Sequence, residues 1–158
     1  MAKHTDTPAQ LQLSQQICHS LYSATNALVR TYRPLLDAAD LTYPQYLVML
    51  ALWEENDVPI KNLVERTRLD SGTLTPILKR LEAKGLIRRV RSDQDERQRL
   101  IEVTETGWAR RDACLNIPQQ LFCSTRLSEE EARELKSLAE RLYRHLGALD
   151  SGRDALAE

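Results

Sequence analysis

The residues of this sequence with the most versatile chemistry are its three cysteines, and Cys18 has the most informative surroundings. It lies in the stretch QQICHSLY, where Tyr22 follows four residues later. A thiolate attacks the O–O bond of a peroxide and becomes a sulfenic acid, which a second thiol can trap as a disulfide. No Lys or Arg lies one helical turn from Cys18, so tyrosine hydroxyls are the available groups to stabilise a thiolate. The alternative interpretation is a small buried hydrophobic residue, which many free cysteines are.

The spacing of the cysteines restricts their other roles. They are odd in number and far apart, and neither CxxC nor a Cys/His cluster with zinc spacing occurs. We therefore expect no disulfide framework, no metal site and no cofactor, and we interpret Cys114 as a core residue. The N-terminal MAKHTDTPAQ has no apolar signal region, and no stretch approaches the roughly 20 apolar residues of a membrane span. This predicts a cytoplasmic protein with reduced thiols and no membrane contact.

Charge is distributed unevenly along the chain. The 158 residues are 42% hydrophobic and 28% charged, which predicts one folded domain, and the net charge is −1. Between Val58 and Arg99, however, the chain has 11 Lys and Arg but only 6 Asp and Glu, and the rest of the chain carries a net charge of −6. A basic block in an otherwise acidic protein suggests a polyanion as partner for that block. A solvated charged face is the alternative.

Apolar residues recur every three or four positions from about Ala9 to Ala38, which predicts a long first helix. Cys18 would then lie two turns or more inside this helix, where the helix dipole contributes little. Pro34 is expected to bend or restart the helix. The apolar stripe is broad enough to suggest burial against a partner chain as well as against the protein's own core. Thr42–Gln45 forms a capping box that begins a second helix.

The central part of the chain predicts a helix-turn-helix followed by a hairpin. Val58-Pro59 opens a short helix, a four-residue turn separates it from a second helix over 72–85, and strand-like runs over 86–92 and 99–104 flank a polar tip. The second helix can enter the major groove of DNA, and the basic hairpin can hold the phosphate backbone. The candidates for DNA contact on these elements are Ser71, Thr73, Thr75, Lys79, Arg80, Arg89 and Arg91.

The remaining elements complete a mainly α-helical chain. Two more helices are expected over 105–124 and 129–146, the last one with a capping box from Ser128 to Glu131. Tyr46 and Trp53 are expected in the core of the second helix. About six helices with one hairpin predict a winged helix-turn-helix fold.

The block VPIKNLVERTRLDSGTLTPILKRLEAKGLIRRVRSDQDERQRLIEVTETG is specific, above all LDSGTLTPILKRLE followed by DER and VTETG. With this block the chain resembles the MarR family of dimeric bacterial transcription regulators. The resemblance implies a helical dimerisation region over 1–40 and 105–150, a DNA-binding region over 41–104 and a tail over 151–158. It also implies that Asp95 and Arg97 lie at the wing tip, where Arg97 enters the minor groove and Asp95 braces it.

The stretch CHSLYSATNALVRTYRPLLDAADLTYPQYLVMLALWE resembles one branch of that family, the organic hydroperoxide regulators (OhrR). The resemblance implies that Cys18 is the peroxide-reactive thiol and that Tyr32 and Tyr43 of the partner chain hydrogen-bond its sulfur, with Tyr22 nearby. Cys123 falls where two-cysteine members place the thiol that links to the reactive cysteine of the other chain. His19 stands where the family often has phenylalanine, which leaves the peroxide preference open.

These resemblances imply a homodimeric repressor that binds a pseudo-palindromic operator when reduced and releases it when organic hydroperoxide oxidises Cys18. One alternative is a MarR-type regulator released by a small phenolic or electrophilic ligand. A thiol peroxidase is disfavoured, because there is no CxxC, no arginine beside Cys18, and the basic hairpin would be unexplained. The sequence therefore predicts a regulator and not an enzyme.

Overall fold

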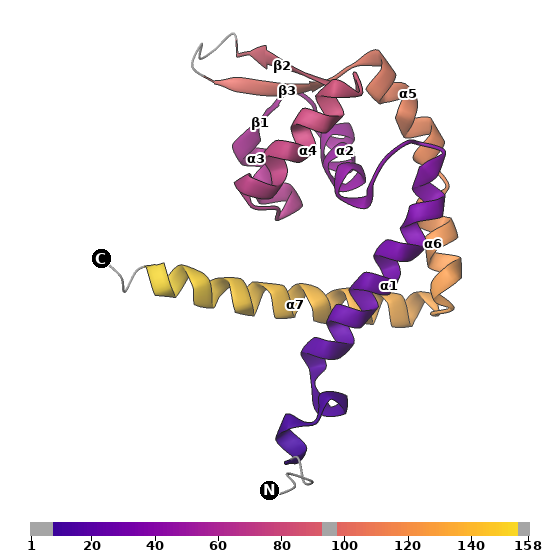
Figure 1. Cartoon of the computed structure of the whole chain (residues 1–158), viewed down its shortest axis with the longest axis vertical. Coiled ribbons are helices and arrows are strands. Elements are labelled where there is room, and N and C mark those ends of the chain that lie inside the picture. The colour runs from indigo at the N-terminus through magenta and orange to yellow at the C-terminus, as the bar shows by residue number, and fades with distance from the viewer. Residues whose placement is uncertain (1–7, 93–97, 155–158) are drawn as a thin grey trace, which may run out of the picture. The chain divides into compact units, whose positions relative to one another are not determined.

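A computed structural model of the chain describes residues 8–92 and 98–154, with side chains described up to residue 147. The described residues form a mainly helical chain with a small sheet, which confirms the predicted fold class (Figure 1). Among them, two 3₁₀ turns come first, and seven α-helices and three strands follow. In chain order they are η1 (Ala9–Leu11), η2 (Leu13–Gln15), α1 (Ile17–Asp37), α2 (Tyr43–Glu54), β1 (Val58–Pro59), α3 (Ile60–Thr67), α4 (Ser71–Ala83), β2 (Ile87–Arg91), β3 (Arg99–Val103), α5 (Glu105–Cys114), α6 (Ile117–Thr125) and α7 (Glu129–Asp154).

The first helix begins later than the sequence predicts. Gln12 and Gln16 have extended backbones, so the chain makes two separate 3₁₀ turns before α1 starts at Ile17. The side chain of Gln16 stabilises this arrangement by donating from Nε2 to the carbonyl oxygens of Gln10 at 2.8 Å and Gln12 at 3.1 Å. Pro34 does not end α1, which continues to Asp37.

Helices α2 and α4 form where their capping residues predict them. Thr42 and Gln45 make the reciprocal capping box of α2. Asp70 caps α4 by accepting from the backbone N–H of Thr73 at 2.8 Å. Gly85 follows the C-cap of α4 with a φ of +68°, which glycine adopts at little cost, and the next N–H returns to Leu81.

The sheet has the strand order β1-β3-β2, and both pairs are antiparallel. The hairpin of β2 and β3 matches the prediction, and its register pairs Arg88 with Glu102 and Arg91 with Arg99. The sequence does not predict strand β1, because Val58-Pro59 is typical of the opening of a helix. Val58 instead pairs with Ile101 at the other edge of β3.

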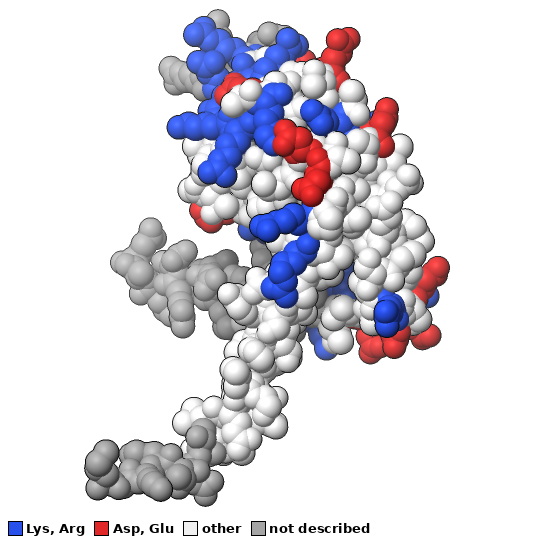
Figure 2. All heavy atoms as spheres, turned by 45° about the vertical axis from the view of Figure 1, so that its right-hand side comes forward, with Lys and Arg blue, Asp and Glu red and all other residues white. Residues whose placement is uncertain are grey.

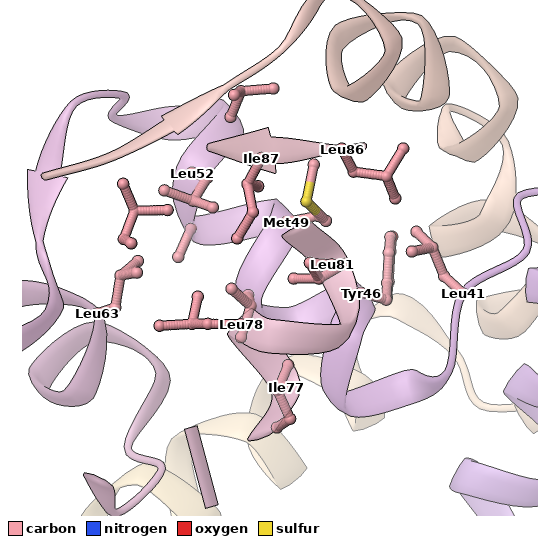
Figure 3. Close-up of a cluster of buried hydrophobic side chains, with 14 of the residues drawn as sticks. Leu41, Tyr46, Met49, Leu52, Leu63, Ile77, Leu78, Leu81, Leu86 and Ile87 are labelled. Carbon is pink, nitrogen blue, oxygen red and sulfur yellow. The ribbon is translucent and has the colours of Figure 1, made fainter. Parts of the chain in front are cut away.

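The core of this region lies between α2, α4 and the sheet, with Leu63 closing it from α3 (Figure 3). Its largest fully buried side chains include Tyr46, Met49, Leu78 and Leu81. Tyr46 therefore lies in the core, as predicted. Trp53 packs against the same core while half-buried, and its ring N–H donates to the carbonyl of Gly107 at 3.1 Å.

The chain divides into two compact units, one up to Pro118 and one from Gln119 onward. The helix expected over 105–124 is two helices, α5 and α6. Pro118 explains the break, because in a continuous helix its ring would clash with the carbonyl of Cys114. In the second unit Ser128 and Glu131 form the predicted capping box, and α7 runs on to Asp154. No helix within the described ranges has both the length and the apolarity to span a membrane.

Candidate DNA interface and cysteine site

The exposed face of α4 presents the side chains predicted for DNA contact. Ser71, Thr73, Thr75, Lys79 and Arg80 are all exposed. The opposite face is buried against α2 and the sheet and consists of Leu74, Ile77, Leu78 and Leu81. The 3.6-residue period of the helix thus separates a packed face from a polar face that is free to enter a groove.

Two threonine hydroxyls on this face already donate hydrogen bonds within the chain. The Thr73 hydroxyl donates to the Asp70 carboxylate at 2.6 Å, and the Thr75 hydroxyl donates to the carbonyl of Ser71 at 2.8 Å. The hydrogen bonds from Thr73 hold the pKa of Asp70 below its usual value, so this carboxylate stays ionised as the helix cap. Both threonines keep a methyl group and acceptor lone pairs for a further partner.

The three arginines of β2 differ in the ion pairs and hydrogen bonds that they form. Arg88 is tied to Glu102 by two hydrogen bonds at 2.6 and 2.8 Å, and this pairing lowers the pKa of Glu102. Arg89 is half-buried and forms an ion pair with Glu82 of α4 at 3.3 Å, although its Nε makes no hydrogen bond within the described part of the chain. Arg91 is exposed and has no ion-pair partner in the described ranges. Glu82 and Glu102 were not anticipated as partners, although hairpin register would have indicated the second.

Strand alternation places Arg91 on the same side of the sheet as Ile87 and Arg89, the side that faces α4. Arg91 also lies directly opposite Arg99, and like charges in such a pair repel each other. An anion bound between them would relieve this repulsion. Figure 2 shows Lys and Arg gathered at the end of the unit that carries the hairpin. Asp95 and Arg97, predicted at the tip, lie outside the described residues.

Cys18 is exposed and is the second residue of α1. The expectation that it lies two turns inside the helix is wrong, because the chain before Ile17 forms 3₁₀ turns. The first turn of a helix has unpaired N–H groups and a partial positive charge, which favour an anion such as a thiolate. Tyr22, one turn further along α1, is 71% exposed.

Tyr32 and Tyr43 pack together where α1 ends and α2 begins. Their ring centroids lie 4.6 Å apart, and Tyr46 lies 5.9 Å from Tyr32. Cys18 precedes Tyr32 by fourteen residues of the same helix, which corresponds to about 21 Å along its axis. A single chain therefore cannot bring this tyrosine pair to its own Cys18.

Burial raises the pKa of Tyr32 to about 12, with smaller contributions from Tyr43 and Tyr46. Burial also raises the pKa values of those two tyrosines. All three hydroxyls are thus protonated donors at neutral pH.

These raised pKa values predict a loss of stability in alkali. The folded state holds the Tyr32 proton more tightly than the unfolded chain, so its contribution is complete below about pH 10 and is lost as the pH rises towards 12. We expect the free energy of unfolding, measured with urea, to fall over this interval. The fall should be smaller in Tyr32→Phe, and an equal fall in the variant would contradict the assignment.

The other two cysteines differ in environment. Cys114 is 4% exposed and belongs to the core, as predicted, and burial raises the pKa of its thiol. Cys123 is exposed in the second unit, and the side-chain N–H of Gln119 lies 3.7 Å from its sulfur. All three thiols are free. Within the described residues, no group of three or more His, Cys, Asp or Glu is placed to hold a metal ion.

Residues 30–113 match the family model for the transcriptional regulators SarA and Rot. The chain is also 43% identical, over 80% of its length and 86% of the relative's, to the organic hydroperoxide resistance transcriptional regulator of Bacillus subtilis. This chain belongs to the MarR/SarA family of winged helix-turn-helix transcription regulators. As a member, it is a DNA-binding regulator and not an enzyme.

Solved structures agree with this membership. The chain resembles reduced AbfR bound to DNA, with 36% identity, a TM-score of 0.73, and coverage of 89% of this chain and 96% of that one. AbfR is a protein of Staphylococcus epidermidis, and its disulfide form matches with 34% identity, a TM-score of 0.60, and coverage of 85% and 94%. A mutant of Escherichia coli MarR in complex with operator DNA shares the fold, with a TM-score of 0.73, 23% identity, and coverage of 79% and 91%.

Proposed function

We propose that this MarR/SarA-family regulator is a homodimeric repressor that senses organic hydroperoxides in the cytoplasm. The reduced dimer binds a pseudo-palindromic operator, and oxidation of Cys18 releases it. The observation that carries this proposal is the exposed Cys18 in the first turn of α1, together with a half-buried pair of tyrosines, Tyr32 and Tyr43, that its own chain cannot bring to it. A second chain has to complete the site.

DNA binding follows from α4 and the hairpin. The N-terminal half of α4 enters the major groove, where its exposed side chains face base edges and phosphates. Arg91 and Arg99 take a phosphate between them, and Arg89 braces the wing against Glu82. At the tip, Arg97 enters the minor groove and Asp95 holds it in place. The DNA-binding region then spans 41–104.

The dimer interface consists of the helices in 1–40 and 105–150, with 151–158 as a tail. Large apolar side chains are exposed on these helices in the single chain, which is costly in water. On α1 and just before it, Leu13, Ile17 and Tyr22 are 63%, 73% and 71% exposed. On α7, Leu135 and Leu146 are 51% and 54% exposed. Burial between two copies would cover both surfaces.

The chemistry begins when the Cys18 thiolate attacks the peroxide R–O–OH. The sulfur bonds to the terminal oxygen as the O–O bond breaks, which gives Cys18 sulfenic acid, while RO⁻ takes a proton and leaves as the alcohol. The hydroxyls of Tyr32 and Tyr43 from the other chain stabilise the thiolate, with Tyr22 as a further stabilising tyrosine near the sulfur. Cys123 of the other chain then attacks the sulfenic sulfur, which forms a disulfide and releases water.

The names and the solved forms of the relatives support this proposal. The Bacillus subtilis relative is an organic hydroperoxide resistance regulator. AbfR has been solved both reduced on DNA and with a disulfide formed. In both forms it remains similar to this chain over most of its length.

The experiment that tests the proposal starts with DNA. Reduced protein would be used to select duplexes from a random-sequence library, and affinity for the selected duplex would then be measured before and after treatment with cumene hydroperoxide. We expect tight binding that falls after treatment and returns with dithiothreitol. Binding that is unaffected by the hydroperoxide would contradict the sensing role.

The wing arginines allow a matched prediction. Arg91→Gln should weaken binding to all sequences alike and reduce the slope of log affinity against log salt, by about 0.9 for each phosphate that the protein no longer neutralises. Arg88→Gln is the control, because Arg88 lies on the other side of β2 and is held by Glu102. Equal effects of the two changes on the salt slope would show that Arg91 does not bind phosphate in preference to Arg88.

One observation favours the alternative, a regulator released by a small phenolic or electrophilic ligand. A cleft of about 410 Å³ opens beside Tyr43, with Val29 and Leu41 as apolar lining and Arg33 as a cation for a phenolate or carboxylate. Under this alternative, a phenolic acid would release DNA from Cys18→Ser as effectively as from the unmodified protein.

A further inference from the structure

The first two turns of α4 expose Gly72, which has no side chain, Thr75, which carries a methyl group, and the ring of Pro76. Helix geometry places Gly72, Pro76 and Lys79 opposite the buried leucines, with Thr75 beside them on one flank and Thr73 on the other, so this surface faces a bound duplex most directly. Gly72 has no side chain to hold the backbone away from DNA. Gly72 and the ring of Pro76 together make the centre of the exposed face of α4 apolar as far as Lys79.

The hydrogen bonds of α4 decide what its threonines can offer a base. The Thr75 proton is used by the carbonyl of Ser71 at 2.8 Å, and the Thr73 proton is used by Asp70 at 2.6 Å. As long as these bonds are kept, neither hydroxyl has a proton to donate to the N7 or O6 acceptors of guanine. What each threonine still has for a base is a methyl group and an oxygen that only accepts.

We propose that Thr75 specifies A·T base pairs in the major groove by packing its methyl group against the thymine methyl, and that Thr73 does the same from the opposite flank of the face. Only the A·T pair presents both a methyl group and the adenine N6 amino donor in that groove. The methyl group of each threonine can contact thymine, and its oxygen can accept a hydrogen bond from the adenine amino group. This inference rests on the proposed placement of α4 on DNA and adds which bases it recognises.

The test replaces thymine by deoxyuridine, which removes the C5 methyl group and leaves base pairing unchanged. In the duplex selected by the reduced protein, each thymine of the half-site would be replaced in turn. We expect at least one replacement to weaken binding about fourfold, as burial of one methyl group implies, and about fifteenfold when both half-sites are changed.

Two variants of Thr75 separate its methyl group from its hydroxyl. Thr75→Ser keeps the bond to the Ser71 carbonyl and loses the methyl, so it should bind thymine and deoxyuridine duplexes equally. Thr75→Val keeps the methyl and loses the hydroxyl, so it should retain the fourfold preference. Thr73→Ser, at the flank of the face, should lose a preference at a neighbouring thymine.

The outcomes distinguish this inference from the function on which it rests. If no duplex is enriched by the reduced protein, both are overturned. If a duplex is enriched and bound tightly, but no deoxyuridine replacement weakens binding, only the methyl contact is overturned. A preference for thymine that persists unchanged in both Thr73→Ser and Thr75→Ser would also overturn it.

Discussion

Cys18→Ser should bind DNA like the unmodified protein and lose its response to organic hydroperoxide. The substitution exchanges one small, exposed side chain for another, so fold and DNA affinity should be kept. In the unmodified protein, oxidation should weaken binding by about tenfold or more, in line with typical coupling between distant sites. In Cys18→Ser the change should stay within about twofold. The measurement is affinity for the selected duplex, by fluorescence anisotropy, before and after cumene hydroperoxide.

The matched control is Cys114→Ala, which removes the buried thiol of α5. It should respond to hydroperoxide like the unmodified protein, because Cys114 belongs to the core and has no part in the proposed chemistry. If Cys18→Ser still releases DNA on oxidation while Cys114→Ala does not, the reactive thiol has been assigned to the wrong residue.

Gly107→Ala should destabilise the fold strongly although it adds only one carbon atom. A Cβ at this position would lie 2.1 Å from the Leu86 carbonyl oxygen and 2.7 Å from a methyl carbon of Val103. Real side chains do not approach so closely, so α5 would have to move away from the sheet and strain the bond from Trp53 to the Gly107 carbonyl. We expect a loss of about 3 kcal/mol or more, seen as a fall in melting temperature of roughly 10 °C.

The same substitution at Gly147 of α7 is the control. A Cβ there would meet nothing within 4 Å. Alanine forms helix better than glycine by about 1 kcal/mol, so Gly147→Ala should raise the melting temperature slightly. Equal melting temperatures for the two variants would contradict the close packing of α5 on the wing.

Capping residues and strand-like runs were enough to predict most of the helix-turn-helix and the hairpin. The capping box at Thr42, the cap at Asp70 and the glycine at position 85 each satisfy local backbone groups, so they are visible in the sequence. The two strand-like runs on either side of the polar tip are visible in the sequence, and the structure has the strands in nearly the predicted places. The division of α4 into a buried and an exposed face follows from the 3.6-residue period of its apolar residues alone.

Other features depend on contacts that no local pattern contains. The start of α1 is set by the side chain of Gln16 bonding back to Gln10 and Gln12. The two-residue β1 is too short for alternation and exists because β3 has an edge to pair with. In the candidate DNA interface, the ion pair from Arg89 to Glu82 joins a strand to a helix and could not be derived from spacing.

The most direct measurement of the central claim is a map of the disulfides formed by hydroperoxide. Unlabelled and ¹⁵N-labelled reduced chains would be mixed and allowed to exchange, treated with a small excess of cumene hydroperoxide, digested without reductant and analysed by mass spectrometry. The proposal predicts a Cys18–Cys123 link that includes peptides of mixed isotope, because the two thiols come from different chains. Cys18 recovered as an unlinked, unoxidised thiol would contradict the sensing mechanism and leave a winged-helix regulator that responds to another signal.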